Sequence, residues 1–362
     1  MKKLFILAAA AVAVLAACTK TEVVNNTPDK AISFAVANYA TQTKATTNGS
    51  LVTEGYQNFT TSAWYHTAVG ATAQAFMTNE NIKFDGTNKW APESRIYYWP
   101  KTGYINFFSY AGTKTLTISE YGFALNNTTI KAQGTDKDNI LVADAALGFS
   151  ANDDTPQYGF NSVSEGVPTL FHHMLSRVKF YIKVDASDVD DTKYNWKVDV
   201  NSATVSYSNK GSLAVTFDPE TAATPATPTW KTAVWTPGAT DATLSKVSTA
   251  VSVNADGKAA SSYELLIADS VVMPQELSVT NVTFALNYTL TCTYDGNNPI
   301  VETVDVPATA IETFYASIDK WEMNKIYTYN IIIKPSGKQI LFDPAVVSWD
   351  DPEISADHTF VN

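Results

Sequence analysis

The sequence predicts an all-β protein built from two tandem β-sandwich domains. Beyond residue 18 no segment shows a sustained helical period; apolar residues recur instead at every second position, as in half-buried strands. Gly, Pro, Asn and Asp separate these segments at short intervals. We count about fourteen to sixteen candidate strands, which is the number expected of two sandwiches. The length of 362 residues agrees with two folded units.

The first eighteen residues, MKKLFILAAAAVAVLAAC, have the features of a secretory signal. Lys2 and Lys3 form a basic start, and the apolar run from Leu4 to Leu15 is too short for a membrane span of about twenty residues. A cysteine directly after Leu-Ala-Ala resembles a bacterial lipoprotein signal. That resemblance implies that the Cys18 thiol carries a lipid and that residues 1–17 are removed. The alternative is an ordinary signal peptide with a chance cysteine.

Composition excludes some partners. The formal charge of −11 disfavours nucleic acid and anionic membrane surfaces, because neither attracts a negatively charged protein. A hydrophobic share of 45% is ample for a core. If Cys18 is lipidated, Cys292 has no disulfide partner in the chain. Cys292 follows the apolar positions of a strand pattern that begins at Val282, so we expect a small core residue rather than a nucleophile.

We expect a lipidated polar tether at residues 18–30 and a first sandwich at 31–168. The first strand alternates bulky and small side chains and carries Ile32, Phe34 and Val36. The most aromatic part is Ile82 to Gly112, in which Tyr104 to Tyr110 has the pattern of a central strand that is apolar on both faces.

A second sandwich is expected at 169–349, followed by a polar C-terminal tail at 350–362. Its first strand lies in LFHHMLSRVKFYIKV, where period two predicts that Val178, Phe180, Ile182 and Val184 point inward. The turn residues Asn209-Lys210-Gly211 predict a hairpin over Ala203 to Phe217.

The sequence contains no catalytic constellation, so we expect no enzyme, no cofactor and no metal. It lacks HExxH, zinc-spaced cysteines, GxSxG and P-loop motifs. His172 and His173 lie next to each other on a predicted strand and so point to opposite faces; we expect one to be buried and the other exposed. An acidic run without the glycine of a calcium loop predicts a solvated turn at Asp185, Asp188, Asp190 and Asp191.

The eight tryptophans leave two functions open. Each of four borders apolar strand residues, which favours core or domain-junction packing: Trp90, Trp99, Trp321 and Trp349. Exposed rings in a shallow row would instead stack on sugars. The alternative function is therefore a glycan-binding surface lipoprotein of a nutrient-capture system.

In four places the sequence resembles the fimbrillin-like lipoproteins of the Bacteroidales, the subunits and accessory proteins of type V pili. The features are, in order, the signal ending at Cys18, RIYYWPKTGYINFFSYAG from Arg95, LFHHMLSRVKFYIKV from Leu170, and WEMNKIYTYNIII from Trp321 with VVSW from Val346. The resemblance spans nearly the whole chain. It implies two transthyretin-like β-sandwich domains and a non-catalytic adhesive subunit at the outer membrane, in a fimbrium, or both.

The same resemblance implies assembly by strand exchange. A protease would cut after a basic residue beyond the first strand and release the lipid anchor together with Ile32, Phe34 and Val36. An extended segment of another pilus subunit would then fill the groove by β-augmentation. In this chain the matching bond is Lys44-Ala45, and the donor segment is expected within 339–362. Further partners are the outer membrane, through the lipid on Cys18, and surface ligands of host or bacterial cells.

The chain departs from the family pattern at the cleavage point, where the family has arginine. Its only arginines are Arg95 and Arg177, both within predicted strands. Three interpretations follow: a protease that accepts lysine acts at Lys44, the subunit stays uncut and anchored, or Lys44 is an ordinary loop lysine.

Overall fold

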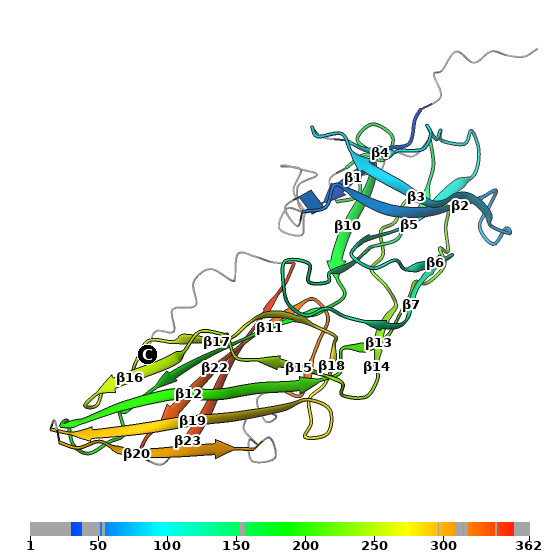
Figure 1. Cartoon of the computed structure of the whole chain (residues 1–362). Helices are drawn as coiled ribbons and strands as arrows, with labels where there is room; N and C mark the ends of the chain where they lie inside the picture. Colours follow the sequence, from blue (N-terminus) through cyan, green and yellow to red (C-terminus); the bar gives the residue numbers. More distant parts are fainter. Residues whose placement is uncertain are drawn as a thin grey trace, which may run out of the picture.

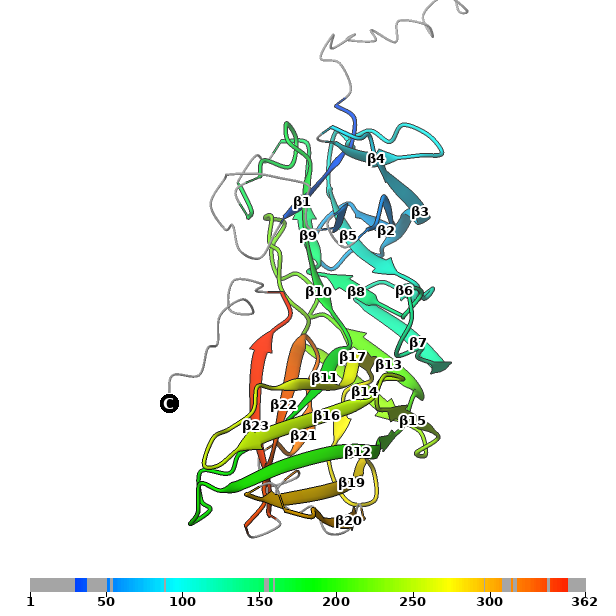
Figure 2. The same ribbon diagram turned by 60° about the vertical axis from the view of Figure 1, so that its left-hand side comes forward.

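The computed structural model describes residues 30–37, 51–52, 55–87, 89–152, 156–158, 160–295, 297–307, 314, 318–336 and 339–350. Every named element in these residues is a β-strand, which confirms the predicted all-β class. The described residues form twenty-three strands, more than the sequence pattern indicated. Among the described residues, no helix has the length and apolarity that a membrane span requires. Figures 1 and 2 show the strands gathered in two units that lie end to end.

The larger sheet of the first unit contains eight strands in the order β2-β3-β4-β1-β10-β8-β5-β9. Because β2 also pairs with β5, the pairings close into a ring around an aromatic core. The strands are β1 (Phe34–Ala37), β2 (Asn58–His66), β3 (Gln74–Phe84), β4 (Trp90–Pro92), β5 (Tyr104–Gly112), β8 (Ile140–Ala143), β9 (Ala146–Phe149) and β10 (Val167–His173). The expected central strand is confirmed in β5, which is buried on both faces from Tyr104 to Ala111.

The second sheet of the first unit takes half of its strands from much later in the chain. Its order is β14-β13-β7-β6, from the strands β6 (Thr117–Ser119), β7 (Gly122–Thr129), β13 (Lys210–Thr216) and β14 (Thr232–Pro237). The predicted hairpin over Ala203 to Phe217 is therefore wrong, because the strand before β13 lies in the other unit. Alternation identifies the buried face of a strand but not its neighbour in the sheet.

The second unit is a sandwich of two sheets. One has the order β17-β11-β22-β23, from β11 (Ser176–Val184), β17 (Glu264–Val272), β22 (Lys325–Lys334) and β23 (Gln339–Ser348). The other has the order β15-β12-β19-β20 with β16 beside β12, from β12 (Tyr194–Tyr207), β15 (Ala242–Ser245), β16 (Val251–Asp256), β19 (Thr283–Tyr294) and β20 (Ile300–Val306). A small sheet joins β18 (Gln275–Glu276) to β21 (Lys320–Trp321).

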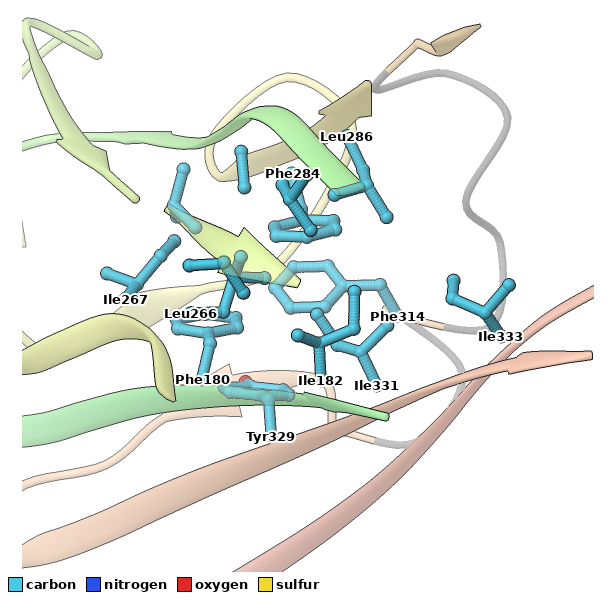
Figure 3. Close-up of a cluster of buried hydrophobic side chains, with 14 of the residues drawn as sticks. Phe180, Ile182, Leu266, Ile267, Phe284, Leu286, Phe314, Tyr329, Ile331 and Ile333 are labelled. Atoms are coloured by element: carbon cyan, nitrogen blue, oxygen red, sulfur yellow. The ribbon is translucent and has the colours of Figure 1, made fainter. Parts of the chain in front are cut away.

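Stacked aromatic rings fill the core of this sandwich (Figure 3). The rings of Phe180 and Tyr329 lie 4.7 Å apart, and Phe284 stacks on Phe180 at 5.7 Å. The predicted inward positions of β11, the first strand of this sandwich, are confirmed, since Val178, Phe180, Ile182 and Val184 are fully buried. In β19 the alternation holds as far as Leu290, but Cys292 is only half-buried, so its placement in the core is wrong.

The segment LFHHMLSRVKFYIKV crosses from one unit to the other. Its first part ends β10 in the first unit, and its second part is β11 in the second unit. Only Met174 and Leu175 separate the two strands, and both side chains are fully buried in a third core cluster at the junction. The expected boundary between 168 and 169 falls within β10.

Candidate functional site

The strand β1 is one of the strands that form the ring of the first unit. The structure places all three expected residues of the first strand in the core: Ile32 is 2% exposed, Phe34 1% and Val36 0%. The ring of Phe34 meets Phe59 and Phe107 edge to face at centroid distances of 5.5 and 5.6 Å. We call the space that these three side chains fill, between β4 and β10, the β1 groove.

In the described strands, β1 is the connection between β4 and β10. It pairs in parallel with β10 along its whole length, from Phe34 opposite Val167 to Ala37 opposite Leu170. On its other side it meets β4 at Phe34 opposite Trp90. Just before β1, the amide of Ile32 donates to the Tyr97 carbonyl at 2.8 Å. Removal of β1 would therefore open the ring and expose the apolar core beneath.

The opposite face of β1 carries small side chains. Ala35 is 2% exposed and Ala37 3%, so this face is covered as well. Gly166 lies against the strand with a φ of +119°, where a Cβ would come within 2.7 Å of the Phe34 carbonyl carbon. A glycine is required there for both its conformation and its lack of a side chain. The strand thus buries bulky apolar side chains on one face and the small residues Ala35 and Ala37 on the other, while Ser33 is only half-buried.

Other expected site residues lie outside the described part of the chain. These are the lipidation residue Cys18 and the cleavage pair Lys44 and Ala45. The expected tail at 350–362 is described only at Asp350.

The end of β23 is fixed to the first unit through His172. The ring bonds Asp144 through Nε2 at 3.0 Å and Asp350 through Nδ1 at 2.8 Å. Burial disfavours the charged imidazolium, but the hydrogen bonds to the two carboxylates outweigh it and raise the His172 pKa to about 9. Asn324 donates to Asp350 at 2.6 Å, which holds that carboxylate in place. At neutral pH a charged, buried network therefore joins the last described residue to β10.

The neighbouring ring, His173, is buried in a different environment. It stacks on Trp349 at 3.9 Å and bonds the Asn139 side chain through Nδ1 at 2.9 Å. Burial, together with the charge of Arg177, lowers the His173 pKa to about 3, so the ring is neutral. The two rings do point to opposite faces, but the expectation that one is exposed is wrong. The two units close over both faces of β10, and a sequence pattern cannot show this. We name the contacts of His172, His173, Trp349 and Asp350 the junction cluster.

A second buried polar cluster lies where the chain leaves β13. The carboxylate of Glu220 accepts hydrogen bonds from Tyr104, from Tyr121 at 2.6 Å and from Asn106 at 2.9 Å. Burial would raise the Glu220 pKa, but the donated hydrogen bonds lower it overall. The cluster attaches the loop after β13 to β5 and to Tyr121, the residue before β7. The sequence does not indicate this cluster, because the loop DPETAATPATPT has the composition of a solvated segment.

The described residues include no group of His, Cys, Asp and Glu that could hold a metal ion. In the acidic run, Asp185 bonds Lys334 at 2.8 Å. A cavity of about 850 Å³ lies between β14 and the β18–β21 pair. Trp235 and Trp321 line it, but both rings are nearly buried and both indole N–H groups are bonded, to the Met174 carbonyl and the Tyr329 hydroxyl. The cavity therefore offers a sugar ring little flat aromatic surface.

Comparison with known proteins gives a family match. The model of the fimbrillin-like family matches residues 43–349. A search of curated proteins found no match. Among solved structures, a fimbrial protein of Bacteroides vulgatus is 14% identical, covers 89% of this chain and 100% of its own, and has a TM-score of 0.46. The C-terminally truncated tip fimbrial protein Mfa3 of Porphyromonas gingivalis is 9% identical, covers 89% of this chain and 100% of its own, and has a TM-score of 0.36. The fimbrial anchor protein Mfa2 of the same organism is 13% identical, covers 88% of this chain and 98% of its own, and has a TM-score of 0.28.

Proposed function

Because the chain belongs to the fimbrillin-like family, we propose that it is a non-catalytic fimbrial subunit or accessory protein that assembles by β-strand exchange and serves in adhesion. Family membership supports a fimbrial role at the cell surface and gives no support for an enzyme. The observation that carries the exchange step is the position of β1. It is the first strand of the described residues, and its removal would open a ring of paired strands.

The proposed route begins at the membrane. A lipid on Cys18 anchors the chain to the outer membrane, and cleavage of Lys44-Ala45 detaches the anchor together with β1. An extended strand from another subunit then enters the β1 groove. The ladder of β10 supplies hydrogen bonds to the incoming backbone, and the pockets of Ile32, Phe34 and Val36 select its side chains.

Energetics explain why β1 should stay in place until it is replaced. Full burial of one such side chain contributes about 1.5–3 kcal/mol, so the empty groove would expose a large apolar surface. It would also leave β10 with an unpaired edge, and such edges promote aggregation. A strand that supplies the same three apolar contacts would cover the exposed apolar surface and pair the free edge of β10 again.

The test is the N-terminus of the protein recovered from cells, together with limited trypsin treatment of the purified protein. We expect a mature N-terminus at Ala45 in the fimbrial fraction and lipidated Cys18 in the membrane fraction. Trypsin should cut at Lys44, and the cut chain should form strand-exchanged oligomers. The Lys44→Gln chain is the matched control and should stay uncut at this bond. Strand exchange is overturned if the chain cut at Lys44 releases β1 and neither oligomerises nor binds any fimbrial subunit.

A further inference from the structure

The strand β20 forms the lower margin of the second unit in Figures 1 and 2, at the end away from β1. Among the described strands it pairs only with β19, so the other edge of its backbone is open. We propose that this edge pairs with β20 of a second copy of the chain, antiparallel and across a two-fold axis at Thr303. The inference goes beyond the proposed function, because it joins chains side by side and does not require β1 to leave.

The strand is exposed along most of its length. Ile300 is 73% exposed and Val301 59%, which makes them two of the three most exposed large apolar residues in the described part of the chain. Lysine and proline commonly protect a sheet edge from further pairing, and β20 contains neither. An apolar edge of this kind is a template for another strand.

Two prolines fix the register of such a pair. Pro299 precedes β20 and Pro307 follows it. Because proline has no N–H for a ladder, pairing is limited to the seven residues between them. One antiparallel register uses all seven: it places Ile300 opposite Val306 of the second copy and Thr303 opposite its own counterpart. A shift in either direction shortens the ladder.

The apolar residues of β20 match in this register. Val306 lies at the margin of the core of the second unit, where it is half-buried. The exposed Ile300 of the second copy would cover it, and the same contact would occur twice in the dimer. On the opposite face of the strand, Thr303 would meet Thr303, a favourable cross-strand pair.

The charges of β20 match as well, and they select the antiparallel arrangement. Glu302 would lie opposite Val304 of the second copy, and Asp305 opposite Val301, so no carboxylate directly faces another. In a parallel pair in register, each carboxylate would lie beside its own counterpart, which is destabilising. The sequence of the strand is therefore self-complementary in the antiparallel direction only.

The pairing would act mainly between chains that are held close together. A ladder of seven residues is smaller than a standard interface of about 1,600 Å², so two free chains should associate weakly. Subunits in a fimbrium, or chains anchored to one membrane, would present the same edge many times. Avidity would then strengthen their side-by-side association.

Disulfide trapping tests the two-fold axis in the uncut full chain, with Cys18→Ser and Cys292→Ser as the background. Thr303→Cys would place two thiols opposite each other, with Cα atoms about 4.5–5.5 Å apart, a separation that a disulfide can span. Val301→Cys is the matched control, because it is an exposed position on the same face but would lie about 13 Å from its counterpart. We expect Thr303→Cys to form covalent dimers about tenfold faster under mild oxidation. Equal rates, or no dimer in either variant, would overturn the proposal.

A charge swap tests the register without cysteines. Val301→Asp would put a carboxylate opposite Asp305 at two places in the dimer, which should weaken self-association about tenfold. Adding Asp305→Lys would pair opposite charges at the same places and should restore it. Sedimentation equilibrium over a concentration series measures the dissociation constant. The proposal is wrong if Val301→Asp leaves that constant unchanged or if the unaltered chain is monomeric at every concentration. Since β1 stays in place in all these chains, failure of strand exchange would not alter the result.

Discussion

The first and last described strands of the chain differ in almost every respect. β1 has four residues, all buried, and sits between two neighbours inside a closed ring. β23 has ten residues, is paired on one side only, and is exposed or half-exposed along its length. The contrast teaches that length of pairing does not decide which strand is structurally critical. Loss of β1 would open the ring around the core of the first unit. Loss of β23 would remove an edge strand and leave the sheet of β17, β11 and β22 paired.

The largest expected difference in stability is between variants that remove one aromatic ring from each strand. Phe34→Ala should lower the free energy of unfolding by about 3–5 kcal/mol, because the ring is enclosed by others and leaves a cavity. Phe342→Ala should cost less than about 2 kcal/mol, because that ring is only partly buried. Urea denaturation of both variants measures the difference. An equal or larger loss for Phe342→Ala would contradict this view of β1.

The next effect concerns the end of β23. Asp350→Asn removes the charge opposite His172 and should lower the free energy of unfolding by about 1.5–3 kcal/mol, as expected for a hydrogen bond to a charged group. Asp343→Asn is the matched control, since Asp343 is an exposed residue of β23. Urea denaturation applies again. Similar values for the two variants would show that the junction cluster does not hold β23.

The pH dependence tests the same cluster. The His172 pKa of about 9 lies above the value of about 6.5 in an unfolded chain, so its stabilisation is complete below pH 6.5 and is lost as the pH rises to 9. The His173 pKa is shifted in the opposite direction, to about 3. The neutral ring therefore favours the folded state above pH 6.5, and this stabilisation is lost as the pH falls from 6.5 towards 3. Thermal unfolding from pH 6 to 10 should show a decline that His172→Gln flattens. An unchanged decline in that variant would assign it to other groups.

The smallest effect concerns the loop after β13. Glu220→Gln keeps the shape of the side chain but weakens the hydrogen bonds from Tyr104 and Tyr121, which should cost about 1 kcal/mol. Hydrogen exchange in residues 218–229 should become faster, while exchange in β1 should not change. The exposed Glu264 provides the control variant Glu264→Gln. Unchanged exchange in the loop would show that Glu220 does not attach it to the first unit.

Local pattern was sufficient for part of the candidate site. The alternation of Ile32, Phe34 and Val36 with small residues predicted a strand and its buried face, and the structure buries all three side chains. The parallel partner, β10, lies about 130 residues further along the chain, and no property of either segment identifies the other. The hydrogen bonds of His172 in the junction cluster and those of Glu220 escaped prediction for the same reason, because they are made by polar residues whose burial depends on distant segments.

The sequence by itself determined the all-β class and, in β1 and β11, which face of the strand is buried, since both follow from side chains two positions apart. The tertiary structure decided which strands pair. It placed β13 beside β7 in the first unit and not beside the preceding strand, and it closed the ring through β1. Pairing is decided by packing between segments far apart in the chain, where many partners satisfy the same alternation. The groove that carries the proposed function exists only because of that closure.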